Sequence, residues 1–235
     1  MKLAVIPARG GSKRIKSKNI IDFCGKPIIS YALEAAAKSG IFDKIHVSTE
    51  SDEIKAVVES LGVKIDFMRP KELADDYTGL LAVLKWVVSK YREEGIFFDD
   101  VCCLMPCAPL VEADDIIRAF DLYMKHARQY PLYVVAPFPV PVEWAFRRNA
   151  DGFLTPVVPG AGAKRSQDLE SAFFEAGPFT IFPAVHVLEP GKHMDSSIIS
   201  MVTPLEKAVD IDTAEDLQLA ETLYLGRQAR LAGNE

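Results

Sequence analysis

Residues 3–19 read LAVIPARGGSKRIKSKN, and this stretch decides the fold. Leu3 to Ile6 form a short, continuous apolar run, which is typical of a strand buried on both faces of a parallel sheet. The loop that follows contains two adjacent glycines, and five of the eleven residues from Arg9 to Asn19 are cationic. A buried strand that opens into such a loop predicts an α/β protein with a ligand site beyond the carboxyl ends of its strands.

Strand-like and helix-like segments alternate over the first 140 residues and again near the end of the chain. Apolar runs predict further strands at 45–49, 63–68, 101–105, 132–138 and 198–202, and helical periodicity predicts helices at 27–38, 54–61, 80–91, 116–124 and 213–230. This order predicts a mostly parallel sheet with helices on both faces. The loops at 7–19, 69–80 and 105–112 then lie at the ligand-binding edge.

The regular alternation breaks between about 139 and 192, where prolines, glycines and aromatic residues become dense. We expect an insertion of hairpins and loops there, within a single domain that spans residues 1–235. Its apolar side chains suggest an arm for dimerisation.

Composition limits the class of partner and the compartment. The chain has 235 residues, of which 49% are hydrophobic. Its net charge of −6 argues against duplex nucleic acid as the main partner. No apolar run approaches the length of a membrane span, and the first strand is too short for a signal peptide. The four cysteines, at positions 24, 102, 103 and 107, show neither zinc nor disulfide spacing. We therefore expect a cytoplasmic protein with reduced thiols that does not bind a membrane.

The first loop has the chemistry of a polyphosphate site. Gly10 and Gly11 allow backbone N–H groups to approach a phosphate, and the loop cations can neutralise several negative charges. Four of the five loop cations are expected to do so: Arg9, Lys13, Arg14 and Lys18. The loop is neither a Walker A motif nor a GxGxxG dinucleotide motif, and the latter absence disfavours a dehydrogenase. The alternative to a polyphosphate site is that residues 7–19 form a solvated basic loop without a ligand.

The loop also resembles a known motif. Residues 6–15, IPARGGSKRI, together with Lys18 and Asn19, resemble the opening motif of the CMP-sialic acid synthetases, also called acylneuraminate cytidylyltransferases. The resemblance continues in the same order at 47–50, 69–76, 105–110, 164–168 and 210–213. It implies a Rossmann-like nucleotidyltransferase fold, a homodimer, CTP as donor, Mg²⁺ as cofactor and an acidic nine-carbon (nonulosonic) sugar as acceptor. The implied reaction is attack of the acceptor's anomeric hydroxyl on the α-phosphorus of CTP, with release of pyrophosphate.

Within this family, residues 22–27, 101–104 and 164–169 are most similar to the branch that acts on pseudaminic acid. Three positions depart from the family pattern. Met105 stands where the sialate branch has Gln, and Leu80 stands where Ser or Thr is usual, although Thr78 can serve instead. The segment 173–179 matches neither branch and is expected to line the sugar pocket. N-acetylneuraminic and legionaminic acids therefore stay open as alternative acceptors.

The resemblance also implies site residues. Arg9, Lys18 and Asp212 are expected to act in catalysis. The nucleotide contacts are expected from Ala8, Arg9, Gly10, Gly11, Ser12, Lys13, Lys18, Asn19, Arg69, Thr78, Met105 and Pro106. Lys164, Arg165 and Gln167 are expected to bind the acceptor, because an arginine offers a bidentate fork to a carboxylate.

Asp210 and Asp212 form the candidate metal site. They are one residue apart, so both carboxylates face the same way on an extended segment. Mg²⁺ typically takes one or two carboxylates together with phosphate oxygens and water. The alternative is that Asp212 caps the final helix, with Glu215 three residues further on as in a capping box.

Two other functions fit the sequence less well. A nucleotide-binding regulatory module would lack the loop cations or the metal carboxylates, and both are present. The enzyme that activates the eight-carbon acid of lipopolysaccharide carries a Tyr-Ala-Ser-Thr-Arg pattern in its opening motif, which this chain does not have.

Overall fold

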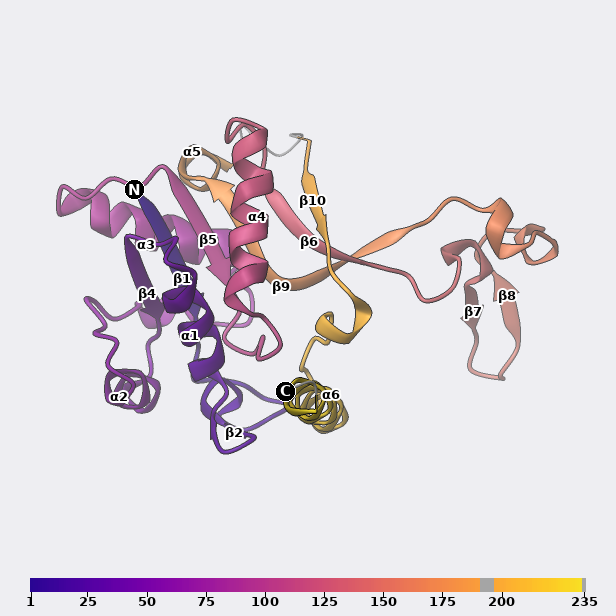
Figure 1. Cartoon of the computed structure of the whole chain (residues 1–235), viewed down its shortest axis with the longest axis horizontal. Helices are drawn as coiled ribbons and strands as arrows, with labels where there is room; N and C mark the ends of the chain where they lie inside the picture. The colour runs from indigo at the N-terminus through magenta and orange to yellow at the C-terminus, as the bar shows by residue number, and fades with distance from the viewer. Residues whose placement is uncertain (191–196, 234–235) are drawn as a thin grey trace.

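The computed structural model describes residues 1–190 and 197–233. Within these residues a six-stranded sheet has the order β10-β6-β9-β5-β1-β4 (Figure 1). Its strands are β1 (Lys2–Pro7), β4 (Lys44–Ser48), β5 (Asp100–Leu104), β6 (Leu132–Pro137), β9 (Phe173–Pro183) and β10 (Ile199–Val202). All pairings are parallel except those of β9, which runs antiparallel to both β5 and β6. The prediction of a mostly parallel sheet is confirmed.

Helices cover both faces of the sheet, as predicted. Ile6 of β1 belongs to the core on one face, together with α1 (Ile29–Ser39), α2 (Asp52–Ser60) and α4 (Ala113–Lys125). Leu3 and Val5 belong to the core on the other face, with α3 (Leu80–Glu93) and α5 (Ala184–Leu188). Alternate residues of β1 thus contribute to two apolar layers, one on each face of the sheet. This is why β1 is apolar from Leu3 to Ile6.

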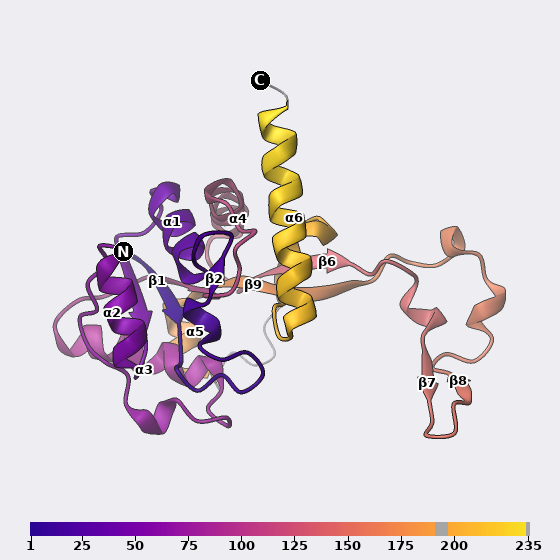
Figure 2. The same ribbon diagram turned by 90° about the horizontal axis from the view of Figure 1, so that it is seen from below.

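A third, smaller core attaches the C-terminal helix α6 (Ala214–Ala232) to the body. Phe23 packs edge-to-face on Tyr31 and Tyr224 at centroid distances of 5.2 and 5.6 Å. Phe23 belongs to the hairpin of β2 (Asp22–Phe23) and β3 (Lys26–Pro27). The C-terminal part of α6 projects clear of the sheet (Figure 2). Among the described residues, no helix is both long enough and apolar enough to cross a bilayer.

The predicted strand at 63–68 is wrong. The chain turns at Gly62, which has a φ of 84°, and then passes β4 without joining the sheet. Asp66 accounts for this path, because its carboxylate accepts from Tyr91 Oη at 2.6 Å and pairs with Lys44 Nζ at 2.6 Å. The segment bends to give this partly buried carboxylate its partners.

The predicted insertion is shorter than expected, because residues 173–183 form β9 in the middle of the sheet. The register of β9 against β6 shifts between Glu175 and Thr180, and Gly177 in this bulge has a φ of 68°. The bulge interrupts the period of two, so the strand could not be recognised from its pattern. Residues 191–192 of the predicted insertion lie outside the described residues.

The remaining insertion, residues 138–172, extends away from the body and is called the arm below (Figure 1). It contains the antiparallel hairpin of β7 (Phe146–Arg148) and β8 (Leu154–Pro156). Short 3₁₀ helices in the arm are η3 (Val142–Trp144), η4 (Ala161–Ala163) and η5 (Ser166–Asp168), and those in the body are η1 (Lys18–Ile20), η2 (Lys71–Leu73) and η7 (Leu205–Lys207).

Candidate active site

A cavity of about 620 Å³ opens at the carboxyl ends of β1 and β5, the edge at which parallel sheets bind ligands. Its walls come from the loop after β1, the loop before α3, the loop after β5, the bulge of β9 and the segment before α6. Eleven of the predicted site residues line it. They are Arg9, Ser12, Lys13, Lys18, Asn19, Arg69, Thr78, Met105, Pro106, Asp210 and Asp212.

Three predicted nucleotide contacts do not line the cavity. Ala8 is fully buried, and its N–H bonds to Ser48 O at 2.9 Å. The N–H of Gly10 is already used, because it donates to Glu50 Oε1 at 2.7 Å. A Cβ at Gly10 would lie 3.0 Å from Ser51 Cβ, so close packing against the N-cap of α2 accounts for this glycine. Gly11 faces open space.

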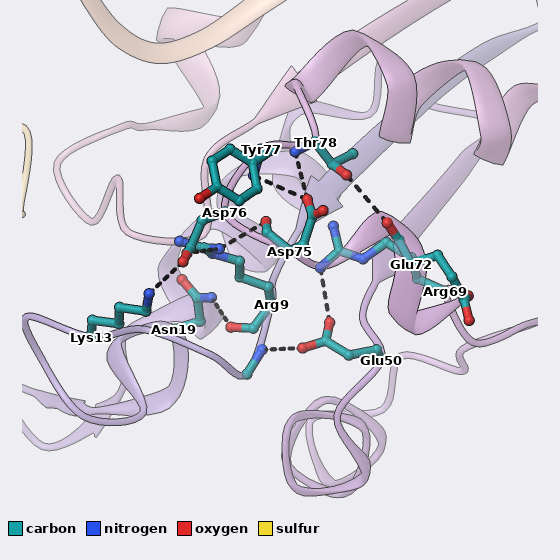
Figure 3. A network of polar contacts seen from close by, with 11 residues as sticks. Arg9, Lys13, Asn19, Glu50, Arg69, Glu72, Asp75, Asp76, Tyr77 and Thr78 are labelled. Carbon is teal, nitrogen blue, oxygen red and sulfur yellow. Dashed lines mark hydrogen bonds and ion pairs between the residues drawn. The ribbon is translucent and has the colours of Figure 1, made fainter.

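Asp76 holds two of the loop cations (Figure 3). Arg9 Nη1 lies 2.8 Å from Asp76 Oδ1, and Lys13 Nζ lies 2.5 Å from Asp76 Oδ2. Arg9 Nη1 also donates to Asp75 O at 3.0 Å. Hydrogen bonds from Lys13 and Arg9 lower the pKa of Asp76, so its carboxylate is ionised at neutral pH. The Asp76 carboxylate thus pairs with two cations that are suited to bind a phosphate.

Two further loop cations, Lys18 and Arg14, pair with Asp212. Lys18 Nζ lies 3.1 Å and Arg14 Nη2 2.8 Å from Asp212 Oδ1. Burial raises the pKa of Asp210, and the negative charge of Asp212 raises it further. Two carboxylates are therefore held near one another in a partly dehydrated corner, where a bound cation would relieve their repulsion.

The cap of α6 differs from the predicted alternative. Thr213 is the N-cap, with its hydroxyl accepting from Asp216 N at 3.3 Å, and Asp216 Oδ2 accepts from Thr213 N at 2.7 Å. The capping box is therefore formed by Thr213 and Asp216, not by Asp212 and Glu215. Thr213 lies one residue closer to α6 than Asp212 and caps its first turn. The Asp212 side chain is therefore free to pair with Lys18 and Arg14.

The donor set suits an open Mg²⁺ site better than a closed structural zinc site. Asp210 and Asp212 supply hard oxygen ligands, and no group of three or more metal-ligating side chains occurs among the described residues. A structural zinc ion requires four protein ligands, whereas Mg²⁺ binds through one or two carboxylates and completes its shell with phosphate oxygens and water.

Asn19 fixes the loop from inside. It is 6% exposed, and its Nδ2 donates to Arg9 O at 2.8 Å. Its Oδ1 accepts from Cys107 Sγ at 3.2 Å. Burial raises the pKa of Cys107 to about 12, so the thiol stays protonated and acts as a donor, not as a nucleophile.

The predicted acceptor residues are elsewhere. Lys164, Arg165 and Gln167 are exposed on the arm and do not line the cavity. Arg165 Nε pairs with Asp168 Oδ2 at 3.0 Å. Within one chain, the arm that carries these three residues extends away from the sheet (Figure 1), and none of the three is among the residues that line the cavity.

Known proteins resemble this chain in sequence and in fold. The model of the cytidylyltransferase family matches residues 3–140, which is more than half of the chain. The chain belongs to the cytidylyltransferase family. This matched region carries the loop after β1, Arg69, Thr78 and the loop after β5.

Relatives of this cytidylyltransferase extend the match. It is 37% identical to the pseudaminic acid cytidylyltransferase of Campylobacter jejuni, over 94% of this chain and 95% of that protein. It is 28% identical to the CMP-N,N'-diacetyllegionaminic acid synthase of Legionella pneumophila, over 94% of this chain and 95% of that protein. These matches confirm the predicted family and the prediction of a CTP-dependent nucleotidyltransferase.

A solved structure confirms the predicted fold of the cytidylyltransferase. A CMP:2-keto-3-deoxy-manno-octonic acid synthetase in complex with CTP superposes with a TM-score of 0.73, covering 96% of this chain and 99% of that one. Its sequence identity is 17%, so the likeness is one of fold.

Sequence reasoning missed Glu50 in this cytidylyltransferase. Arg69 is 5% exposed, and its Nη2 lies 3.0 Å from Glu50 Oε2. A signal was present, because Glu50 follows the predicted strand at 45–49 directly, and the ends of parallel strands share one edge of the sheet.

Proposed function

We propose that this cytidylyltransferase transfers CMP from CTP to pseudaminic acid and releases pyrophosphate. The observation that carries the proposal is the nearly full-length similarity to the Campylobacter jejuni enzyme, at 37% identity against 28% for the Legionella pneumophila legionaminic acid synthase. The cavity supports it, because it combines cations for a triphosphate with two carboxylates for a metal ion.

The reaction requires charge stabilisation more than covalent chemistry from the protein. The anomeric oxygen of the acceptor attacks the α-phosphorus, its proton is lost, and the bond from the α-phosphorus to the bridging oxygen breaks. Pyrophosphate leaves with that electron pair. Arg9, Lys13 and Lys18 would hold the β- and γ-phosphates and stabilise the charge that develops there. Arg9 and Lys13 would exchange the Asp76 carboxylate for phosphate oxygens when CTP binds, before this step.

Asp210 and Asp212 would hold Mg²⁺. When bound, Mg²⁺ supplies positive charge to the phosphate oxygens and helps to orient them. Lys18 would hold Asp212 in place and contact the nucleotide phosphates at the same time, since its ammonium lies 3.1 Å from Asp212 Oδ1. The observed contact between Lys18 and Asp212 supports the proposal that these two residues act in catalysis.

The nucleoside would lie between the loops before α3 and after β5. Arg69 is almost fully buried, yet its Nε has no hydrogen-bond partner among the described residues. Arg69 also lines the cavity, and a buried guanidinium with an unused donor suits a site that a ligand completes. Thr78, Met105 and Pro106 line the same part of the cavity, and Ser12 and Asn19 border the phosphates.

We propose that the arm joins two copies of the chain. Its hairpin presents exposed apolar side chains, with Phe146 54%, Phe153 73% and Leu154 58% exposed. Surfaces of this kind favour association. Lys164, Arg165 and Gln167 would then bind the acceptor in the cavity of the partner subunit, because the arm holds them away from their own.

We place the enzyme in the cytoplasm. Its four cysteines are free thiols, and two of them, Cys102 and Cys103, are buried side by side in β5. Reduced thiols are typical of that compartment.

Pyrophosphate release from CTP and Mg²⁺ tests the proposal, with pseudaminic, legionaminic and N-acetylneuraminic acids offered in parallel. We expect turnover with pseudaminic acid at a kcat/KM at least tenfold above that for the other two acids, which corresponds to about 1.4 kcal/mol. Preference for either other acid would reassign the acceptor. Binding of CTP without turnover of any acid would favour a regulatory module. Legionaminic and N-acetylneuraminic acids stay in the test because of the segment 173–179. This segment departs from the family pattern and lines the cavity at Ala176 to Pro178.

A further inference from the structure

We propose that Glu50 is a positioning residue for nucleotide binding, which fixes Arg69 and the phosphate loop with one carboxylate. The proposal rests on the nucleotide-binding role proposed above for Arg69. It concerns a residue that contacts no substrate in this arrangement, because Glu50 does not line the cavity.

The two carboxylate oxygens of Glu50 serve different segments (Figure 3). Oε1 accepts the N–H of Gly10 at 2.7 Å, and Oε2 lies 3.0 Å from Arg69 Nη2. The Glu50 side chain is 14% exposed and that of Arg69 is 4% exposed. The contact between Glu50 and Arg69 is therefore largely shielded from water, whereas the contact with Gly10 lies at the surface. A hydrogen bond between charged groups is strong in partly buried surroundings.

The backbone holds this carboxylate in place. Glu50 lies between the end of β4 and Ser51, the N-cap of α2, whose hydroxyl accepts from Ile54 N at 3.4 Å. Arg69 N–H donates to Thr49 O at 2.8 Å, so the two segments are also joined through their main chains. Glu50 is thus held on a rigid corner between a strand and a helix.

Glu50 holds one edge of the Arg69 guanidinium. Glu50 takes Nη2, and Nε, on the same edge of the guanidinium, is buried with no partner among the described residues. Arg69 as a residue lines the cavity. A guanidinium is planar, so holding one of its edges fixes the direction of the other donors. Glu50 therefore sets the orientation of Arg69 toward the nucleotide before CTP arrives.

The close approach at Gly10 couples this clamp to the phosphate loop. A Cβ at Gly10 would lie 3.4 Å from Glu50 Oε1 and 3.0 Å from Ser51 Cβ, so only glycine lets the loop come this near without displacing its neighbours. Arg9, the residue before it, carries the guanidinium proposed to bind phosphate. One carboxylate thus sets the spacing between the phosphate end and the nucleoside end of the cavity.

A positioning role predicts a separation of kinetic constants. Contacts between Arg69 and the nucleotide are present both in the ground state and in the transition state, so their loss raises KM and leaves kcat nearly unchanged. A residue that only stabilised the fold would lower the melting temperature without this pattern.

The experiment measures the Kd of CTP in the presence of Mg²⁺ by calorimetry, and KM and kcat by pyrophosphate release. The variants are Glu50→Gln, Arg69→Met and the double variant, each checked by circular dichroism and thermal melting. Glu53→Gln, on the exposed side of α2, is the matched control for the loss of one negative charge.

We expect Glu50→Gln to raise the Kd and KM for CTP about tenfold, with kcat within about twofold, because a charged hydrogen bond to Arg69 is lost. In the Arg69→Met background, the same substitution should change the Kd by less than about twofold, since the coupled partner is gone. Glu53→Gln should leave all three constants unchanged.

Additive effects of the two substitutions, or a fall in kcat at constant KM, would overturn the proposal. The measurement of the Kd of CTP needs no acceptor, so it tests the role of Glu50 independently of which acid the enzyme uses. Turnover of a different acid by the wild-type enzyme would revise the proposed function and leave the test of Glu50 intact.

Discussion

The ammonium of Lys18 lies 3.1 Å from Asp212 Oδ1 and also donates to Ile211 O at 2.7 Å. The loop after the first strand is thereby joined to the segment before the last helix. Arg14 Nη2 lies 2.8 Å from the same carboxylate oxygen, so Asp212 pairs with two cations of the phosphate loop. The proposed metal site and the proposed phosphate site form one electrostatic unit.

Asp212→Asn should lower kcat by about 10²- to 10³-fold, which is the usual effect of removing one group that stabilises developing charge. The fold should persist, because the cap of α6 is formed by Thr213 and Asp216. Pyrophosphate release at saturating Mg²⁺ measures the loss. Asp216→Asn is the control and should lower the melting temperature while retaining turnover; full activity of Asp212→Asn would remove Asp212 from the site.

Asp76→Asn should tighten the binding of CTP. The Asp76 carboxylate competes with phosphate for Arg9 and Lys13, and its removal frees both cations. We expect the Kd of CTP to fall about two- to fivefold at low salt, and less at high salt, as for an exposed ion pair. Calorimetry at two ionic strengths checks this. Weaker binding would instead mean that Asp76 contacts the nucleotide or its metal ion.

His46 should make the protein less stable below neutral pH. It is fully buried, and burial lowers its pKa from 6.5 to about 4. Its Nδ1 lies 3.0 Å from Tyr91 Oη, whose proton goes to Asp66, so the neutral ring donates from Nδ1. Between pH 6.5 and 4 the unfolded chain binds a proton at His46 that the folded chain does not bind.

Stability therefore falls as the pH drops through this window, by about 3 kcal/mol for His46 alone. Urea unfolding of the wild type and of His46→Gln, from pH 7 to pH 4, measures the effect. The variant should show a shallower decline in the free energy of unfolding. Equal slopes in the two proteins would contradict a neutral, buried His46.

Mixed dimers test the arm. Arg165→Ala and Asp212→Asn should each inactivate the homodimer. If the arm acts on the partner's cavity, a purified heterodimer has one site with both substitutions and one with neither, so about half of the wild-type activity returns. If the arm served its own cavity, both sites would stay defective. A monomer in light scattering would contradict the proposed association itself.

Much of the site could be predicted from the sequence, because it depends on strand order. Once Leu3 to Ile6 and Val101 to Met105 are recognised as buried strands, their following loops must lie at one edge of the sheet. The alternation of strands and helices also predicts coverage on both faces. The identity of the nucleotide residues came from the resemblance to a known family.

The rest depends on contacts between distant segments, which leave no periodic pattern. Glu50 and Asp76 pair with residues in other loops, so their partners could not be read locally. β9 was hidden because its bulge breaks the period of two. The cap of α6 was misplaced by one residue, although Thr213 and Asp216 have the spacing of a capping box.

The position of β9 has a consequence for synthesis of the chain. Strands β5, β1 and β4 can pair as soon as residue 104 has emerged, but the open edge of β5 receives its neighbour only with residues 173–183. During that interval β5 presents unpaired N–H and C=O groups along a very apolar strand, a template for pairing with another nascent chain. Truncation within the arm should therefore yield insoluble protein, because β9 closes the seam between the two halves of the sheet.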